Sequence, residues 1–360
     1  MKHPHLLVCI SGHGFGHVAQ TAPVLNALKQ LVPQLQLTIR SSIPYSHLRS
    51  RIPHEFNHVQ EAVDPGMLMV SALEVDAERS LEAYAEFHQD WDARIEAEAM
   101  RIDALRPDVV LTNVAYLPLE GAARLGIPAV AMCSLNWADI LRDFCVGMPG
   151  AAPILQQIEQ AYLQSHVFLR LEPAMPMPWL ERQRLLGPVA QPRRSQREKI
   201  NKLLGIQPDS KLILVSMGGI AMQFPVDAWP AIPDVLWLVP DDWQTQRSDC
   251  ISVRSLQMDF SDALASCDVL LTKPGYGAFV EAACAGIHVL YVKREAWPEQ
   301  EILIDWLARH GSGEELEAHQ LHTGEFEEIL VSLLQREKPE PIQATGTQEA
   351  AQYLATLLAS

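Results

Sequence analysis

Two series of short apolar segments, each interleaved with helix-like stretches, constrain the fold of this chain more than any other feature. The first series lies at 6–11, 35–40, 107–113, 127–133 and 166–171, and the second at 211–219, 234–239, 250–254, 267–273 and 287–293. Apolar strands that alternate with helices are typical of parallel sheets covered by helices on both faces. The sequence therefore predicts an α/β protein with two doubly wound domains, in line with its length of 360 residues.

The boundary between the domains is expected in 172–197, a Pro- and Arg-rich stretch between the two series. We place the first domain at 1–185 and the second at 186–342. The stretch 343–360 follows a break at Pro339 and Pro341 and contains "TQEAAQYLATLLAS". It predicts a C-terminal helix that packs back on the first domain.

Charge and cysteine content exclude several classes of function. The formal net charge of −16 argues against nucleic acid as the main partner, because phosphate binding on that scale needs clustered Lys and Arg. The six cysteines form no C-x-x-C pair, which favours buried thiols in a reducing compartment. The apolar runs are too short for a signal-peptide core or a spanning helix. We expect a cytoplasmic protein with at most peripheral membrane contact.

The first strand runs directly into "SGHGFGH", residues 11–17. Gly12, Gly14 and Gly16 permit positive φ and a close backbone approach, and the chain becomes helical after His17. His13 and His17 therefore lie near a helix N-terminus, where a neutral imidazole can accept a proton from a hydroxyl. The alternative is a purely structural glycine-rich turn, whose histidines have only local hydrogen-bond partners. The spacing is not the dinucleotide fingerprint, and the second strand lacks the acidic residue that the fingerprint requires.

A second turn, in the second domain, has the character of an anion site. Lys273, Pro274, Gly275, Tyr276 and Gly277 follow an apolar strand and precede a helix. The free N–H groups and positive dipole end of such a helix suit a diphosphate. Glu281 lies one turn further on. Its carboxylate either interacts favourably with the positive end of the helix dipole or accepts hydrogen bonds from two ribose hydroxyls.

These residues carry a resemblance to a known family. The stretch from Met258 to Gly311 resembles the nucleotide-sugar half of GT-B glycosyltransferases of the MurG type, in glycosyltransferase family 28. The "SGHGFGH" turn together with "GYG" and "VEA" is also similar to the N-terminal glycosyltransferase-like region of plant arabinokinases. The resemblance implies the GT-B fold, in which two Rossmann-like domains enclose a cleft and a C-terminal helix follows.

The resemblance also implies roles for single residues. His17 matches the histidine of the N-terminal turn, whereas His13 falls where the bacterial GlcNAc transferases carry glycine. Related transferases orient the histidine with an aspartate at a position where this chain has Asn113, and Asp139 is the nearest acidic alternative. The catalytic candidates are thus His17, His13 and Asn113. The donor-binding candidates are Gly14, Gly16, Ser216, Gly218, Gly219, Met258, Phe260, Lys273, Gly275, Tyr276, Gly277, Glu281, Glu299 and Gln300.

The acceptor side is read from two apolar patterns. An aromatic stripe at helical spacing, from Leu81 to Ile95, predicts core packing, with the acceptor cleft as the alternative. The segment "PGMLMV", residues 65–70, predicts a buried strand, although the resemblance allows an exposed loop for a lipid-linked acceptor.

The function implied is transfer of a sugar from a nucleotide diphosphate sugar, most simply a UDP-sugar, to an unidentified hydroxyl acceptor. We expect no metal and no cofactor beyond the sugar nucleotide, because the helix dipole and the backbone amides can stabilise the leaving diphosphate. Direct displacement with His17 as base inverts the anomeric configuration. A nucleotide-sugar epimerase and a non-catalytic nucleotide-sugar sensor on the same architecture are the alternatives.

Overall fold

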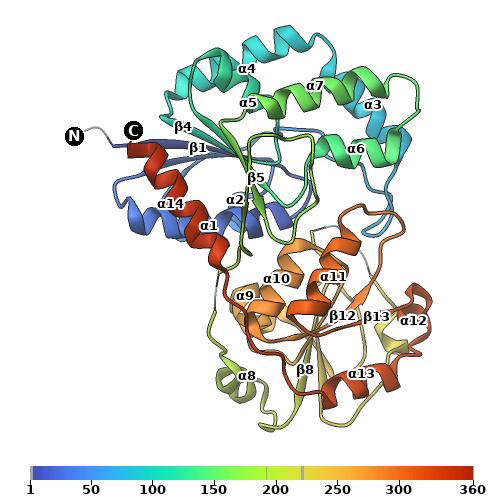
Figure 1. Ribbon diagram of the computed structural model, residues 1–360. Coiled ribbons are helices and arrows are strands. Elements are labelled where there is room, and N and C mark those ends of the chain that lie inside the picture. Colours follow the sequence, from blue (N-terminus) through green and yellow to red (C-terminus); the bar gives the residue numbers. More distant parts are fainter. Residues whose placement is uncertain (1–2, 192, 220–222, 360) are drawn as a thin grey trace.

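The structure is a computed structural model that describes residues 3–191, 193–219 and 223–359, and it contains two domains, each built on a parallel sheet (Figure 1). The first sheet has the strand order β3-β2-β1-β4-β5-β6-β7. Its strands are β1 (His5–Ile10), β2 (Gln36–Arg40), β3 (Asn57–Val59), β4 (Val109–Asn113), β5 (Ala129–Cys133), β6 (Val167–Leu171) and β7 (Gln183–Leu186). The strand order reverses between β1 and β4, where Ile10 pairs with Asn113.

Helices cover both faces of this first sheet (Figure 1). One face carries α3 (Ala77–His88), α4 (Trp91–Leu105), α5 (Leu117–Arg124), α6 (Trp137–Cys145) and α7 (Ala151–Leu163). The other face carries α1 (Gly16–Leu31), α2 (Tyr45–Arg51) and α14 (Thr345–Ala359). Alternate residues of β1 enter the two cores: Leu7 and Cys9 lie in one, and Leu6, Val8 and Ile10 in the other.

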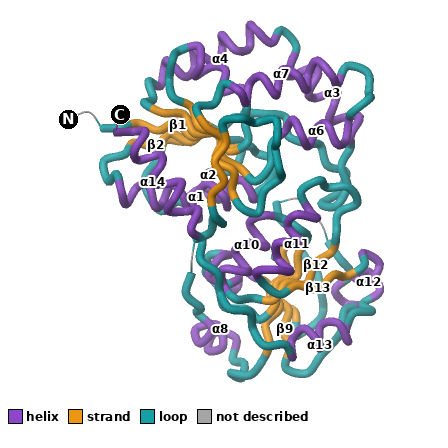
Figure 2. Tube along the Cα trace, viewed as in Figure 1, coloured by secondary structure: helices purple, strands orange, loops and turns teal. Residues whose placement is uncertain are grey.

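The second sheet repeats this arrangement, with the order β10-β9-β8-β11-β12-β13. Its strands are β8 (Lys211–Ser216), β9 (Val235–Val239), β10 (Cys250–Ser252), β11 (Val269–Thr272), β12 (His288–Val292) and β13 (Gly313–Leu316). Its helices are α8 (Arg197–Leu204), α9 (Phe260–Leu264), α10 (Tyr276–Ala285), α11 (Gln300–His310), α12 (Ala318–Thr323) and α13 (Glu327–Gln335), with 3₁₀ turns at Val226–Ala228 and Val253–Leu256. Figure 2 shows α10 and α11 between this sheet and the first domain. The prediction of two doubly wound domains is confirmed.

Two local expectations from the sequence are wrong, and a third, the core packing of the aromatic stripe, is confirmed. The segment 172–197 is not simply a linker, because β7 lies inside it and pairs in parallel with β6. Residues 65–70 form a loop instead of a buried strand, with one isolated bridge between Met69 and Val75. The aromatic stripe is divided between α3 and α4, although most of its side chains, including Tyr84 and Trp91, do lie in the core as predicted.

The C-terminal helix α14 returns to the first domain and packs beside α1 (Figure 1). The chain thus crosses between the domains twice, once after β7 and once before α14. The first crossing segment touches the start of α14: the Gly346 N–H donates to the Pro188 carbonyl over 3.0 Å, and a Cβ at Gly346 would lie 1.9 Å from the Gly187 oxygen. None of the described helices is long and apolar enough to cross a membrane.

Candidate functional site

The first switch point in strand order, between β1 and β4, carries the histidine-containing turn. The Gly14 N–H donates to the Gly12 carbonyl over 2.7 Å, and Gly14 has φ +122°, a conformation that favours glycine. Of the three glycines expected to permit positive φ, Gly14 alone adopts it, and Gly16 is already the first residue of α1. This tight turn directs His13 and His17 to the carboxyl end of the sheet, where ligands of doubly wound folds bind.

His17 has the tautomer that a general base requires. Its Nδ1 lies 2.8 Å from Asn113 Oδ1, an oxygen that can only accept, so Nδ1 carries the proton and Nε2 the lone pair. Burial lowers the pKa of His17 to about 4, and the hydrogen bond to Asn113 opposes this shift. Asp139 does not orient it, because that carboxylate accepts hydrogen bonds from Asn136, Arg142 and Trp179.

His13 has the opposite tautomer. The backbone N–H of Met67 donates to its Nδ1 over 3.3 Å, so the proton of the neutral ring is on Nε2. Burial, followed by the charges of His17, Arg294 and Lys273, lowers its pKa to about 3. The ring stacks on Trp297 of the second domain, with centroids 5.7 Å apart. His13 is therefore a neutral hydrogen-bond donor and cannot accept a proton through Nε2.

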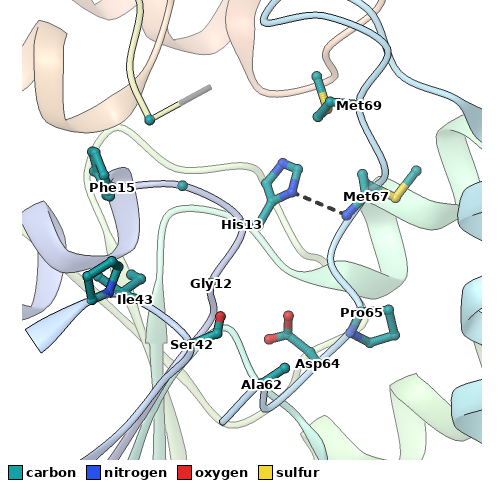
Figure 3. A pocket seen from close by; sticks show the side chains of 13 residues that line it. Gly12, His13, Phe15, Ser42, Ile43, Ala62, Asp64, Pro65, Met67 and Met69 are labelled. Atoms are coloured by element: carbon teal, nitrogen blue, oxygen red, sulfur yellow. Dashed lines mark hydrogen bonds between the residues drawn. The ribbon is translucent and has the colours of Figure 1, made fainter. Parts of the chain in front are cut away.

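A pocket of about 350 Å³ opens beside His13 (Figure 3). Gly12, Ser42 and Asp64 line it together with the apolar side chains of Met67 and Met69, and Gly219 reaches it from the second domain. Ser11 Oγ donates to Asp64 Oδ1 over 2.8 Å, whereas burial raises the pKa of Asp64 to about 6. Polar groups on one wall and methionine on another suit a hydroxyl-bearing molecule of modest size.

The second switch point, between β8 and β11, lies directly against the first. Ser216 pairs with Thr272 at the ends of these strands, and Lys273 follows Thr272. A Cβ at Gly277 would lie 2.7 Å from Ala19 Cβ on α1, so the two helices require glycine there for their close approach. In the same way, a Cβ at Gly219 would lie 3.1 Å from the ring of Phe15. The turns that sequence analysis assigned to opposite halves of a cleft are in contact.

Two basic side chains that have no carboxylate partner among the described residues gather at the N-terminus of α10. Arg294 donates to the Pro274 carbonyl over 2.8 Å and lies over the Trp297 ring. Among the described residues, neither Arg294 nor Lys273 has a carboxylate within ion-pair distance. Burial, and then Arg294, lowers the pKa of Lys273 to about 6, and burial lowers that of Arg294 to about 10. Such a pair, together with the free N–H groups after Gly275, attracts an anion.

Glu281 is buried and already has a partner from the other domain. Arg51, the last residue of α2, forms an ion pair with its Oε1 and donates to Ser261 on α9. The sequence offered a dipole role and a ribose role for Glu281, and the structure adds a third, in which the carboxylate joins the domains. A ribose can reach it only if Arg51 moves away.

The remaining donor-binding candidates are placed differently. The Tyr276 hydroxyl donates to the Glu172 carbonyl and accepts from the Val189 N–H, so this side chain binds the segment that crosses between the domains. Only the backbone N–H of Tyr276, at the start of α10, is then placed to contact a donor. Gln300 binds the backbone of Arg294 through both amide atoms. Met258 and Phe260 pack, partly buried, against the core, and Gly218 lies exposed beside the Lys273 side chain.

Glu299 faces the first domain, where it accepts hydrogen bonds from Ser134 and from Trp297 Nε1. Sequence reasoning missed Gln20, Arg51, Asp64, Ser134, Arg294 and Trp297. Of these, Arg294 carries a signal in the sequence, because it follows an apolar strand of the second series just as Lys273 does.

This chain resembles known proteins closely in fold but only weakly in sequence. No protein-family model matches the chain. Among curated proteins, the L-arabinokinase of Arabidopsis thaliana is 24% identical over 333 residues, which cover 91% of this chain and 32% of that protein. The chain thus spans about a third of the length of the curated relative it matches.

Solved structures cover the whole chain. The glycotransferase of kitacinnamycin superposes with a TM-score of 0.65 at 15% identity, covering 99% of this chain and 100% of that one. UGT89C1 of Arabidopsis thaliana gives 0.63 at 15% identity with 100% of both chains covered. UGT71G1 of Medicago truncatula, solved with UDP-glucose, gives 0.59 at 12% identity with 99% of each covered. At these identities the likeness shows the fold alone, and the chain therefore has the GT-B fold of these glycosyltransferases.

Proposed function

We propose that this protein is a glycosyltransferase, of the MurG-like family 28 type, that transfers a sugar from a UDP-sugar to a hydroxyl acceptor. The observation that carries the proposal is the juxtaposition of two switch points: a histidine in the base tautomer on one side, and Lys273 with Arg294 at a helix N-terminus on the other. The solved complexes of similar proteins with UDP and UDP-glucose support this donor class. Six free cysteines fit the proposed cytoplasmic location.

The proposed reaction is a direct displacement. His17 Nε2 takes the proton of the acceptor hydroxyl as that oxygen attacks the anomeric carbon, and the bond from this carbon to the diphosphate breaks. Lys273, Arg294 and the N–H groups of α10 receive the negative charge that develops on the leaving diphosphate. UDP and an inverted glycoside are the products, and the proton on His17 is later released to water. These cations supply the charge stabilisation without a metal.

The pocket beside His13 is the proposed place for the acceptor. Its polar wall, from Ser42 and Asp64, can bind hydroxyls, and His13 can donate from Nε2. Because Phe15 and Ala19 lie against the second-domain glycines, the domains must separate before a donor can enter. A lipid-linked acceptor would have to place its polar end here.

The test is a panel of nucleotide diphosphate sugars. Each is scored first for stabilisation of the protein, which amounts to about 2.7 kcal/mol at a hundredfold excess over Kd. Release of free UDP only in the presence of an added acceptor supports transfer. Isomerisation of the sugar without an acceptor would instead identify an epimerase, and stabilisation without any turnover would identify a sensor. No stabilisation by any sugar nucleotide at millimolar concentration contradicts the donor assignment.

Proton uptake gives a second, independent measurement. At pH 8 Lys273 is largely neutral in the free protein, because its pKa is about 6. A bound diphosphate favours the charged amine, so binding should take up close to one proton. Calorimetric titration in two buffers of different ionisation enthalpy measures this uptake, and Lys273→Met should remove it.

A further inference from the structure

Four hydrogen bonds lead from His17 to a carboxylate on the other domain. His17 Nδ1 lies 2.8 Å from Asn113 Oδ1, and Asn113 Nδ2 lies 3.2 Å from Gln20 Oε1. Gln20 Nε2 then lies 2.8 Å from Ser134 Oγ, and Ser134 Oγ lies 2.5 Å from Glu299 Oε1. All five side chains are buried. We call this series of side chains the relay.

The carboxylate at one end determines the direction of every bond. Ionised Glu299 can only accept, so the single proton of Ser134 points toward it. The Ser134 oxygen must then accept from the Gln20 amide nitrogen, which leaves the Gln20 oxygen to accept from Asn113. The Asn113 oxygen finally accepts from His17 Nδ1. All four donors point toward Glu299, and bonds aligned in this way strengthen one another.

We propose that Glu299 orients His17 as the general base through this relay, with Asn113, Gln20 and Ser134 as positioning residues. The inference rests on the proposed role of His17 in glycosyl transfer. An amide at position 113 cannot itself stabilise imidazolium, as a carboxylate would. The relay places that negative charge three side chains further away, on Glu299 of the second domain. Because Ser134 and Glu299 belong to different domains, the relay is complete only while the domains are together.

Among the residues that the structure describes, Glu299 is the one charged group that the relay reaches. Cys133 Sγ lies 3.9 Å from His17 Nδ1, and burial raises the pKa of this thiol to about 12. The Trp137 ring lies against His17 and carries no charge. His13, which is near enough for His17 to affect its pKa, is neutral near pH 7. Burial raises the pKa of Glu299, whereas Ser134, Trp297 and Arg294 favour its ionised form.

The first experiment measures the tautomer of His17 and needs no substrate. Nitrogen-15 resonances of histidine-labelled protein are recorded near pH 7, and His17→Gln identifies the signals of residue 17. The wild type should show a protonated Nδ1 and an unprotonated Nε2. Ser134→Ala should give a mixture of both tautomers. Ser165→Ala is the matched control, because this serine is also buried in the first domain and its hydroxyl donates to the Tyr162 carbonyl, outside the relay.

The second experiment measures turnover and a rescue. Ser134→Ala should lower kcat roughly tenfold, change the donor KM less than about twofold, and move the acidic limb of the pH profile to lower pH. Adding Asn113→Asp places a carboxylate directly on His17, so the double variant should recover the lost rate. Glu299→Gln keeps an acceptor for Ser134 but removes the charge, so it should shift the pH limb while keeping the tautomer.

The outcomes separate the relay from the reaction. An unchanged tautomer in Ser134→Ala overturns the relay, as does a double variant that is no faster than Ser134→Ala. If no sugar nucleotide is turned over but the tautomer shifts in Ser134→Ala and not in Ser165→Ala, the relay stands and the transferase proposal fails.

Discussion

The turn after β1 and the turn after β11 each follow a strand at the switch point of their sheet, yet they carry opposite chemistry. The first presents His13 and His17, both neutral because burial lowers their pKa values. The second presents Lys273 beside Arg294, cations that burial destabilises. Two turns that both lie at switch points therefore differ in chemistry, and we expect proton transfer at the first and anion binding at the second.

The largest expected effect is a loss of kcat when the proposed base in the first turn is removed. His17→Ala should lower kcat by roughly 10²- to 10⁴-fold and leave donor affinity nearly unchanged, because a base acts on the acceptor hydroxyl. His13→Gln, which keeps a donor nitrogen, should retain far more activity. Steady-state kinetics with calorimetric donor titration checks both. Full turnover in His17→Ala together with loss in His13→Gln would assign the base to His13.

The second turn should respond in binding rather than in the proton-transfer step. Lys273→Met should weaken UDP binding by roughly 100-fold, since a charge-assisted contact to the diphosphate is lost. The same change should raise the melting temperature, because it removes a partly buried, desolvated amine that has no partner carboxylate among the described residues. Lys293→Met is the control, as this partly exposed lysine pairs with Glu301 and Glu315. Equal effects of the two variants on UDP affinity would remove Lys273 from the donor site.

Glu281 tests whether the second turn also recognises the ribose. Glu281→Gln should weaken UDP roughly tenfold and leave 2′,3′-dideoxy-UDP almost unaffected. Because Arg51 loses its buried partner, the free energy of unfolding should also fall by about 1.5 to 3 kcal/mol, more than a dipole contact would give. Titration with both ligands and urea unfolding measure these effects. Equal weakening for both ligands places Glu281 away from the ribose.

The smallest expected effect is the contribution of His13, in the first turn, to the pH dependence of the free energy of unfolding. The folded-state pKa of His13 is about 3, below the ordinary value of 6.5, so its stabilising contribution is complete above pH 6.5 and is lost as pH falls toward 3. Each such histidine should cost about 0.7 kcal/mol between pH 7 and pH 6. His13→Gln should reduce the loss by that amount in urea unfolding, whereas His319→Gln, an exposed control, should not. Asp64, with its pKa raised to about 6, contributes with the opposite sign.

The sequence predicted the two domains because central parallel strands read as unbroken apolar runs. It missed β7, with the sequence QRLL, and β13, with GEEL, because edge strands are partly exposed and carry polar side chains. Both glycine turns were found since their residues are contiguous. The relay and the Arg51–Glu281 pair could not be found, because they join side chains from distant parts of the chain that meet only in the folded protein.

The contact between Gly187 and Gly346 has a mechanical consequence for the whole molecule. Because the outgoing segment touches the start of α14 at Gly187 and again at Ala190, which exchanges hydrogen bonds with Thr347, the two connections lie side by side and can act as one pivot. Rotation of one domain about that pivot produces its largest displacement at the end of the domain interface farthest from the pivot. A side chain introduced at either glycine would push the two segments apart. It would therefore change how far the domains can open without contacting the groups proposed to react.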